Sequence, residues 1–287
     1  SLSADDFSKP QGVYTFEPKT ENLEEFVLDK KTPAHVRNAS FLGDKMVFVL
    51  NIFNQDKVTD HYSQVYTADF DGRNRRQITN SNSDKRNPVL SPSGSTIAFQ
   101  STLNGEKNRD ALTDVRVERF GIFTTDLEGN EEFISQGTQP QFSPDGKSIL
   151  FFKNRGLYLI NLESRRVDLV WGLSEGGLTY TGMKLDLSDD KLLLAWSSAH
   201  FNDLLVLNID SWSPFRSSIK SRYEVTGFWP KFSPDGKYLA FQEVAQGELY
   251  KTDEQSLVVY KLSDGSKRTI LELDDYYQKP MWINDWK

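Results

Sequence analysis

The sequence predicts an all-β fold: a six-bladed β-propeller with four-stranded antiparallel blades, the last of which is closed by both termini. The main observation is a repeat, in which Pro-Gln-Phe-Ser-Pro-Asp-Gly-Lys from Pro140 recurs as Pro-Lys-Phe-Ser-Pro-Asp-Gly-Lys from Pro230 and, more weakly, from Pro88. A second observation is that no stretch of useful length has the periodicity of a helix. A supersecondary unit of this size cannot bury its apolar face alone, so the units are expected to stack on one another.

The copy that begins at Pro140 predicts the strands of one blade. A first strand ends at Phe142, and 143–146 form a turn, because proline presets φ at the second turn position and glycine accepts a positive φ. The apolar run within 148–153 predicts a second strand that is buried on both faces. A third strand is expected over 156–162 and a more polar fourth strand over 165–170. Apolar inner strands and mixed outer strands are typical of a propeller blade.

Hairpins of third and fourth strands recur in the other units, each with glycine at its turn. The expected strand pairs are 65–70 with 76–79, 121–127 with 132–134, and 257–262 with 268–271. Glycine in a short connection between two such runs is a hairpin signal. Two degenerate copies, 39–48 and 185–196, keep the turn and the apolar run.

The spacing of the copies predicts six blades within a single domain of residues 1–287. Six anchors correspond to the first proline of the repeat and lie 45 to 52 residues apart: Ala39, Pro88, Pro140, Leu185, Pro230 and Pro280. The segments from the N-terminus to the first anchor and from the last anchor to the C-terminus together make 46 residues, which is one more repeat. We therefore expect the termini to share one blade, with 12–16 and 24–28 as outer strands. A shared blade closes the ring and removes free sheet edges.

Composition excludes several kinds of partner and chemistry. The chain has no cysteine, which removes disulfides, thiol catalysis and cysteine metal sites. Its formal net charge of −7 argues against nucleic acid or an anionic membrane as the main partner. No run of residues is apolar and long enough to predict insertion into a membrane. We also expect the protein to be a monomer. The first residue is Ser1, which is consistent with a removed signal peptide or a cut chain.

The Ser-Pro-Asp-Gly-Lys turn, with its upstream proline and its downstream apolar run ending in phenylalanine, resembles the WD-like repeat of the TolB-type β-propellers. The resemblance covers nearly the whole chain, but only the propeller part of the family: TolB carries an additional N-terminal α/β domain, and only 38 residues precede the first anchor here. The resemblance implies a bacterial protein of the periplasm or another extracytoplasmic compartment. It also implies a protein partner at the mouth of the central channel. Similar repeats occur in peptidases of the prolyl-oligopeptidase type and in oligogalacturonate lyases, so the fold does not settle the function.

Catalytic signatures are weak, so the residues favour a protein that is not an enzyme. A serine peptidase needs a Gly-x-Ser-x-Gly nucleophile elbow, and the chain has none. The three histidines, His35, His61 and His200, show no metal-ligand spacing. Asp145 and Asp235 are explained by the turns in which they lie. We expect no cofactor, and the sequence gives no support for a cation in the channel.

The expected binding surface is the mouth of the channel, at the face where the first strand of each blade begins. The Asp-Gly hairpins lie at the opposite face, and irregular loops on a rigid scaffold are the common place for binding residues. Residues just before the anchors should surround this mouth, where arginine and aromatic side chains are frequent interface anchors. The candidate partner-binding residues are Arg37, Arg86, Gln139, Tyr180, Trp229 and Lys279.

Two functions are compatible with these residues. The first is a non-catalytic propeller that binds a protein or peptide partner at the channel mouth. The second is a carbohydrate-active protein that resembles the uronide lyases, or a propeller that binds a small molecule in its central channel. Basic and aromatic residues at the rim suit sugar acids as well as peptides, whereas three dispersed histidines argue against a metal-dependent lyase.

Overall fold

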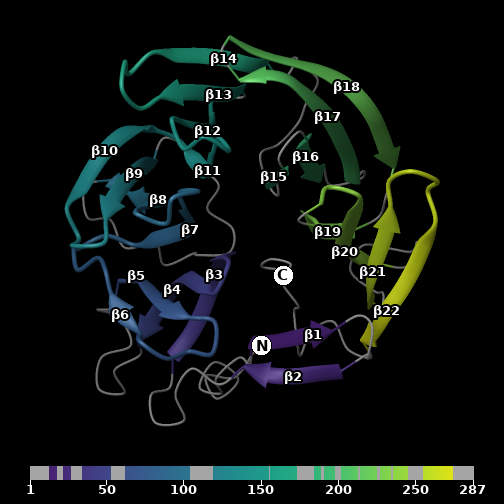
Figure 1. The fold of residues 1–287 in the computed structure, drawn as a ribbon, viewed down its shortest axis with the longest axis horizontal. Helices are drawn as coiled ribbons and strands as arrows, with labels where there is room; N and C mark the ends of the chain where they lie inside the picture. The colour runs from purple at the N-terminus through teal and green to yellow at the C-terminus, as the bar shows by residue number, and fades with distance from the viewer. Residues whose placement is uncertain are drawn as a thin grey trace. The chain divides into compact units, whose positions relative to one another are not determined.

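The computed structural model describes residues 13–17, 22–26, 34–52, 62–103, 119–154, 156–172, 184–188, 191–197, 202–212, 214–224, 227–233, 235–244 and 255–273. Over these ranges the chain forms β-strands and their connections, without an α-helix (Figure 1). It divides into two compact units, Ser1–Asn154 and Arg155–Lys287. Within the described ranges, no helix has the length and apolar character needed to span a membrane.

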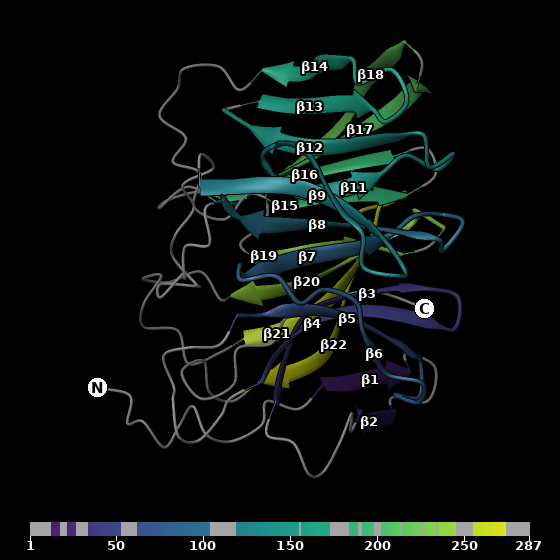
Figure 2. The same cartoon turned by 90° about the vertical axis from the view of Figure 1, so that its left-hand side faces the viewer.

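The first unit contains twelve strands within its described part. They are β1 Val13–Glu17, β2 Asn22–Phe26, β3 Ala34–Leu42, β4 Lys45–Ile52, β5 Gln64–Asp69, β6 Arg76–Gln77, β7 Lys85–Leu90, β8 Thr96–Thr102, β9 Phe120–Asp126, β10 Glu131–Gln136, β11 Thr138–Phe142 and β12 Ser148–Lys153. Two antiparallel sheets have four strands in the orders β3-β4-β5-β6 and β10-β9-β8-β7. Figure 2 shows β7, β8 and β9 side by side. The strands β1 and β2 pair with each other, as do β11 and β12.

The second unit contains ten strands within its described part. They are β13 Gly156–Asn161, β14 Val167–Gly172, β15 Lys184–Ser188, β16 Lys191–Ser197, β17 Asn202–Trp212, β18 Phe215–Glu224, β19 Gly227–Phe232, β20 Tyr238–Val244, β21 Gln255–Lys261 and β22 Lys267–Leu273. Two four-stranded sheets follow the orders β15-β16-β17-β18 and β19-β20-β21-β22, and β13 pairs with β14. The expected all-β fold with antiparallel four-stranded sheets is therefore confirmed.

Most predicted strands agree with the structure to within two residues. The second strand of the Pro140 copy, expected over 148–153, is β12, and its apolar run is buried. The fourth strand starts later than expected, because Arg165 belongs to the preceding turn with a φ of 60°. There the backbone N–H of Asn161 donates to the carbonyl of Arg166 across the turn, at 3.0 Å. The strands expected over 12–16 and 24–28 are β1 and β2, and their membership of a shared blade stays a prediction.

The Ser-Pro-Asp-Gly turn is held by its own side chains. The hydroxyl of Ser143 donates to Asp145 Oδ1 at 2.6 Å, and the backbone N–H of Lys147 donates to the same oxygen at 3.0 Å. The hydroxyl oxygen of Ser143 also accepts the N–H of Ser148 at 3.0 Å. Gly146 has a φ of 70°, a conformation that glycine adopts without steric cost. The same bonds recur in the copy around Asp235, so this turn is structural.

The cores of the sheets are built on their second strands. In the first unit, residues of β4 and β8 form buried clusters with β5, such as Phe48 with Tyr66, and Ile97 and Phe99 with Val65. In the second unit, Phe241 of β20 packs with Phe232, Val258 and other buried residues. Burial of each such aromatic side chain contributes about 1.5–3 kcal/mol. The candidate binding residues within the described ranges lie on strands next to these cores: β3, β7, β11 and β19.

Candidate partner-binding surface

The strands β3, β7, β11 and β19, each at the end of its sheet, share a β-bulge. In β7, Arg86 pairs with Gln100 and Val89 pairs with Ala98, so one extra residue is inserted in β7 relative to β8. The corresponding shifts lie between Arg37 and Ser40, between Thr138 and Gln141, and between Phe228 and Lys231. A bulge bends its strand and redirects side chains, and bulges are frequent next to functional sites.

The repeat motif explains why the bulge occurs at this place. The residue opposite each bulge is a buried phenylalanine of the second strand: Phe48, Phe99, Phe151 or Phe241. Three of the bulges contain the first proline of the repeat, which has no N–H to donate to a ladder. The strand β15 has Leu185 in place of that proline, and its pairing is regular, with Leu185 opposite Leu194. The buried phenylalanine is common to all four bulges, whereas the proline is not, since β3 has Ala39 at that position.

The residue just before the anchor is left-handed in three blades of the first unit. Asn38, Asn87 and Gln139 have φ values of 48°, 47° and 55°. Such a conformation costs a non-glycine residue about 1–3 kcal/mol and tends to occur where the surrounding structure enforces it. Asparagine tolerates it better than most residues. The chain therefore keeps amide side chains at positions where glycine would be less strained.

Gln100 ties two of these positions together. Its side chain is 4% exposed, and its Oε1 accepts a hydrogen bond from Asn87 Nδ2 at 3.1 Å. The same oxygen accepts the backbone N–H of Gln139 at 3.3 Å. Gln100 on β8 thus links the start of β7 to the start of β11, and the sequence pattern gave no sign of this link.

Arg86 is held over an aromatic ring at the start of β7. Its guanidinium carbon lies 5.2 Å from the centroid of the Phe120 ring, and Phe120 is buried. A cation–π contact of this kind contributes about 0.5–1 kcal/mol at an accessible site. Because the side chain is half-buried, the contact restricts its rotamers and orients the guanidinium.

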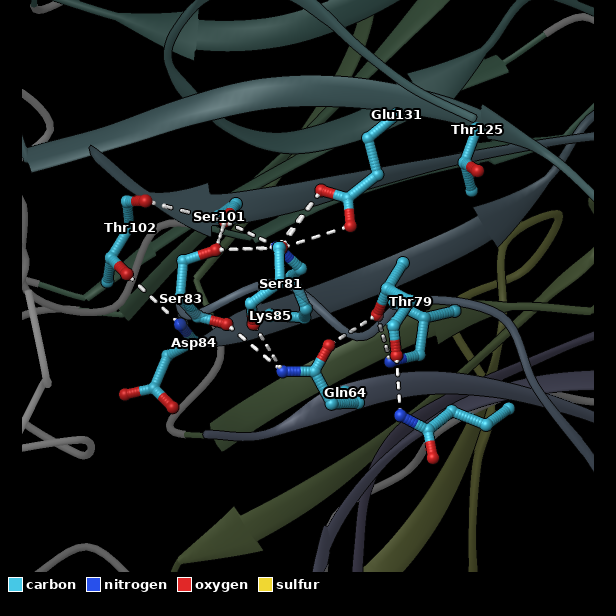
Figure 3. Close-up of polar contacts among 12 residues, drawn as sticks. Gln64, Thr79, Ser81, Ser83, Asp84, Lys85, Ser101, Thr102, Thr125 and Glu131 are labelled. Carbon is cyan, nitrogen blue, oxygen red and sulfur yellow. Dashed lines mark hydrogen bonds and ion pairs between the residues drawn. The ribbon is translucent and has the colours of Figure 1, made fainter. Parts of the chain in front are cut away.

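A buried ammonium group lies beside this position (Figure 3). Lys85 is 1% exposed, and its Nζ lies 2.5 Å from Ser81 Oγ, 2.6 Å from Ser83 Oγ and 3.2 Å from Ser101 Oγ. It also forms an ion pair of 3.1 Å with Glu131 Oε2. Burial lowers the pKa of Lys85, and the nearby Glu131 opposes that shift. A buried ammonium with a carboxylate and three hydroxyl acceptors is a satisfied structural group.

Hydrogen bonds also fix the connection that leads into β7. The carboxylate of Asp84 accepts the backbone N–H of Ser63 at 2.9 Å, and Asp84 N–H donates to Thr102 Oγ1 at 3.0 Å. Gln64 Nε2 donates to the carbonyl of Ser81 at 2.9 Å (Figure 3). The segment preceding Arg86 is therefore ordered by both neighbouring sheets.

In the second unit, an ion pair joins two innermost strands after the anchor position. Asp186 of β15 is buried, and its Oδ1 lies 3.0 Å from Lys231 Nζ of β19. The backbone N–H of Phe232 donates to Asp186 Oδ2 at 2.6 Å. Asp186 therefore binds both the backbone and the Lys231 side chain of β19, the end strand of the next sheet.

The six candidate residues divide into three groups. Arg86 and Gln139 begin neighbouring innermost strands and are connected through Gln100. Arg37 and Trp229 occupy the corresponding backbone positions in β3 and β19. Tyr180 and Lys279 lie outside the described residues. Within the ranges that the structure describes, no three acidic or histidine side chains are grouped as a metal site.

Comparisons with known proteins identify the fold. The structure is similar to TolB of Agrobacterium tumefaciens, with a TM-score of 0.64 and 14% identity over 92% of this chain and 90% of that one. It is similar to TolB of Acinetobacter baumannii, with a TM-score of 0.56 and 17% identity over 82% of this chain and 55% of that one. For the β-propeller domain of the trilobed protease from Pyrococcus furiosus the TM-score is 0.50, with 16% identity over 83% and 71% of the two chains. No family model and no curated protein matches the sequence. The chain folds as a TolB-like β-propeller with antiparallel four-stranded blades.

Proposed function

We propose that this chain is a non-catalytic, six-bladed propeller that binds a protein or peptide partner at the mouth of its central channel. The observation that carries the proposal is the bulge repeated in β3, β7, β11 and β19. It places strained, amide-bearing residues at one end of the innermost strands, next to Arg37 and Arg86. The structural turns with Asp145 and Asp235 lie at the other end of these strands.

The architecture of this proposal follows from the repeat. Six anchors with nearly constant spacing support six blades, and the pair β1-β2 supplies two strands for a blade completed by the C-terminal residues. The protein acts as a monomer with one mouth. The TolB-like fold supports a location in the periplasm or another extracytoplasmic compartment.

The six candidate residues make the contact surface. Arginine and tryptophan are the residue types that most often dominate interface energies, and here they come from Arg37, Arg86 and Trp229. Gln139, Tyr180 and Lys279 complete the rim in the other blades. The bonds of Gln100 and the Arg86–Phe120 contact pre-order part of this surface, which reduces the entropy lost on binding.

Site-specific photo-crosslinking tests the proposal. A benzophenone amino acid is placed at Gln139 or at Trp229, and as a matched control at exposed Ser93, in the turn at the far end of β7. Extracts of the source cells should give the same crosslinked partner from Gln139 and Trp229 and none from Ser93. Equal crosslinking from Ser93 would contradict the proposal. So would a partner that remains bound after the combined substitution of Arg37, Arg86, Gln139, Trp229 and Lys279. Turnover of a polyuronide by the purified protein would contradict its non-catalytic part.

A further inference from the structure

We infer that the bulges of β3 and β7 form an uncharged subsite that binds the main chain of an extended partner segment. The inference rests on the proposed function and adds how the partner is recognised, namely through its backbone and not through particular side chains. Its basis is three side-chain amides at this place, those of Asn38, Asn87 and Gln100. Each of them carries hydrogen-bonding groups that the described part of the chain does not use.

The two asparagines hold equivalent positions in neighbouring strands. Asn38 and Asn87 each lie in the bulge of their strand, directly after its last paired residue. Their φ values, 48° and 47°, put both in the left-handed conformation. The strands β3 and β7 pack against each other within the first unit, and Figures 1 and 2 show them in succession. The two side chains therefore start from the same level of adjacent strands.

The side chain of Asn38 is kept at a position where glycine would be less strained. The left-handed conformation is less favourable for asparagine than for glycine. Among the residues that the structure describes, the half-buried side chain of Asn38 forms no hydrogen bond that would explain it. Strained positions of this kind tend to occur where a ligand binds. Asn38 thus offers an amide donor and an amide acceptor to a partner.

Gln100 adds a buried donor beside Asn87. The backbone N–H of Gln139 is a donor, so the Gln100 atom that faces it, at 3.3 Å, is the oxygen Oε1. Asn87 therefore presents its Nδ2 to the same oxygen, at 3.1 Å. Two atoms are left without a hydrogen bond within the described ranges: Gln100 Nε2, on a side chain that is 4% exposed, and Asn87 Oδ1, on a half-buried one. A buried donor without an acceptor is unfavourable, so a ligand that supplies the acceptor gains affinity.

The two remaining atoms match one residue of an extended peptide. Gln100 Nε2 donates and Asn87 Oδ1 accepts, and the hydrogen bond between their amides keeps the two groups near each other. A residue in an extended chain directs its own N–H and C=O to the same side, as in the hydrogen-bonded pairs of an antiparallel sheet. Because Gln100 is 4% exposed, the approach to it is narrow, which favours a flat backbone group over a sugar ring. The amide of Asn38 pairs in the same way with a second residue of the segment.

Recognition of the main chain differs from recognition of charge. The three amides are neutral, so binding to them forms no ion pair, and the affinity should change little with salt concentration. The backbone is common to all sequences, so two uncharged peptides of different sequence should bind with similar affinity.

Fluorescence anisotropy with labelled peptides tests the inference. The probe is an uncharged twelve-residue peptide of Gly, Ser and Thr, and its comparison peptide has the same sequence with methylated backbone nitrogens. The first variant is Asn38→Gly, and its matched control is Asn154→Gly, at an exposed position with a φ of 42° between β12 and β13. The second variant is Gln100→Glu, which keeps the oxygen acceptor but removes the donor. Its charge-matched control is Gln136→Glu, at an exposed position in β10.

The unmodified peptide should bind at least about tenfold more tightly than the methylated one. Asn38→Gly should weaken its binding by about fivefold and leave the unfolding temperature unchanged or higher, because glycine relieves the left-handed strain. Gln100→Glu should weaken binding by about tenfold, whereas the two control variants should change it less than about twofold. Thermal unfolding of each variant checks that the fold is kept, and Asn38→Gly decides the matter if Gln100→Glu does not fold.

Equal affinity for the two peptides, no binding of either, or equal effects of Asn38→Gly and Asn154→Gly would overturn the inference. A strong fall in affinity with rising salt would overturn it as well, since the subsite would then be ionic. Tighter binding of an uncharged oligosaccharide, lost in the same variants, would assign the subsite to sugars and overturn the peptide. If a partner crosslinks at Gln139 and neither Asn38→Gly nor Gln100→Glu weakens its capture, the proposed function stands and only this inference is refuted.

Discussion

Replacement of Lys85 by methionine should destabilise the protein strongly, although the side-chain volume and the apolar stem are kept. Lys85 is 1% exposed and forms its ion pair with Glu131 at 3.1 Å. Removal of one partner of a buried pair costs about 3–5 kcal/mol, because the remaining charge stays desolvated. Glu131 is 19% exposed, so water can partly solvate its carboxylate, and we expect the lower end, about 3 kcal/mol. The hydroxyls of Ser81, Ser83 and Ser101 lose a donor as well.

A second substitution separates the charge from the packing. In Lys85→Met with Glu131→Gln, no uncompensated carboxylate remains, so the double variant should be more stable than Lys85→Met alone by about 1–2 kcal/mol. The matched control is Lys237→Met, since Lys237 is 72% exposed and pairs with Asp235 at 3.1 Å. A pair of that kind contributes about 0–1 kcal/mol.

Urea-induced unfolding followed by tryptophan fluorescence and circular dichroism gives the free energy of unfolding of all four proteins. The reasoning is refuted if Lys85→Met loses no more stability than Lys237→Met. It is also refuted if the double variant is less stable than Lys85→Met, because the penalty would then come from packing and not from the unpaired carboxylate.

Three further predictions concern the turns and the links between blades. The pKa of Asp235 is lowered from 3.8 to about 2, chiefly by the hydrogen bond from the Ser233 hydroxyl. The ionised carboxylate therefore stabilises the folded protein fully above about pH 4, and this contribution is lost as the pH falls towards 2. In Asp235→Asn the unfolding temperature should depend less on pH over this window. Gly129 has a φ of 91°, and a Cβ at this position would lie 2.6 Å from the carbonyl oxygen of Ile78. Gly129→Ala should therefore lower the free energy of unfolding in urea by about 1–3 kcal/mol. The control Gly43→Ala, at a φ of 58° with open space around the Cβ, should lower it by only about 1 kcal/mol. Gln100→Leu removes the oxygen that accepts hydrogen bonds from Asn87 and Gln139. The free energy of unfolding should fall by about 1–3 kcal/mol, and capture of the partner should weaken. Unchanged capture would show that Gln100 does not order the site.

The extent of prediction from sequence differs between the strands and the site. Strand β12 agreed with its predicted bounds because a continuous apolar run between turn signals is a local pattern. The start of β14 was misplaced because the left-handed turn at Arg165 has no glycine to announce it. Arg86 and Gln139 were proposed as candidates from their place before the anchors, and their role in binding stays a prediction. Their link through Gln100 was not predicted, because Gln100 lies 39 residues from Gln139.

The sequence by itself determined the repeating unit, that is, its strands and its Ser-Pro-Asp-Gly turns. These features depend on contacts within a hairpin, such as the bonds between Ser143 and Ser148, which local residue types specify. Only the tertiary structure decided which side chains from distant segments meet. The Lys85–Glu131 pair, 46 residues apart, joins the two end strands of one sheet, and the Asp186–Lys231 pair, 45 residues apart, joins strands of two different sheets. The period of the repeat encodes neither contact. The orientation of Arg86 over Phe120, which lies in the same sheet, is likewise a tertiary feature.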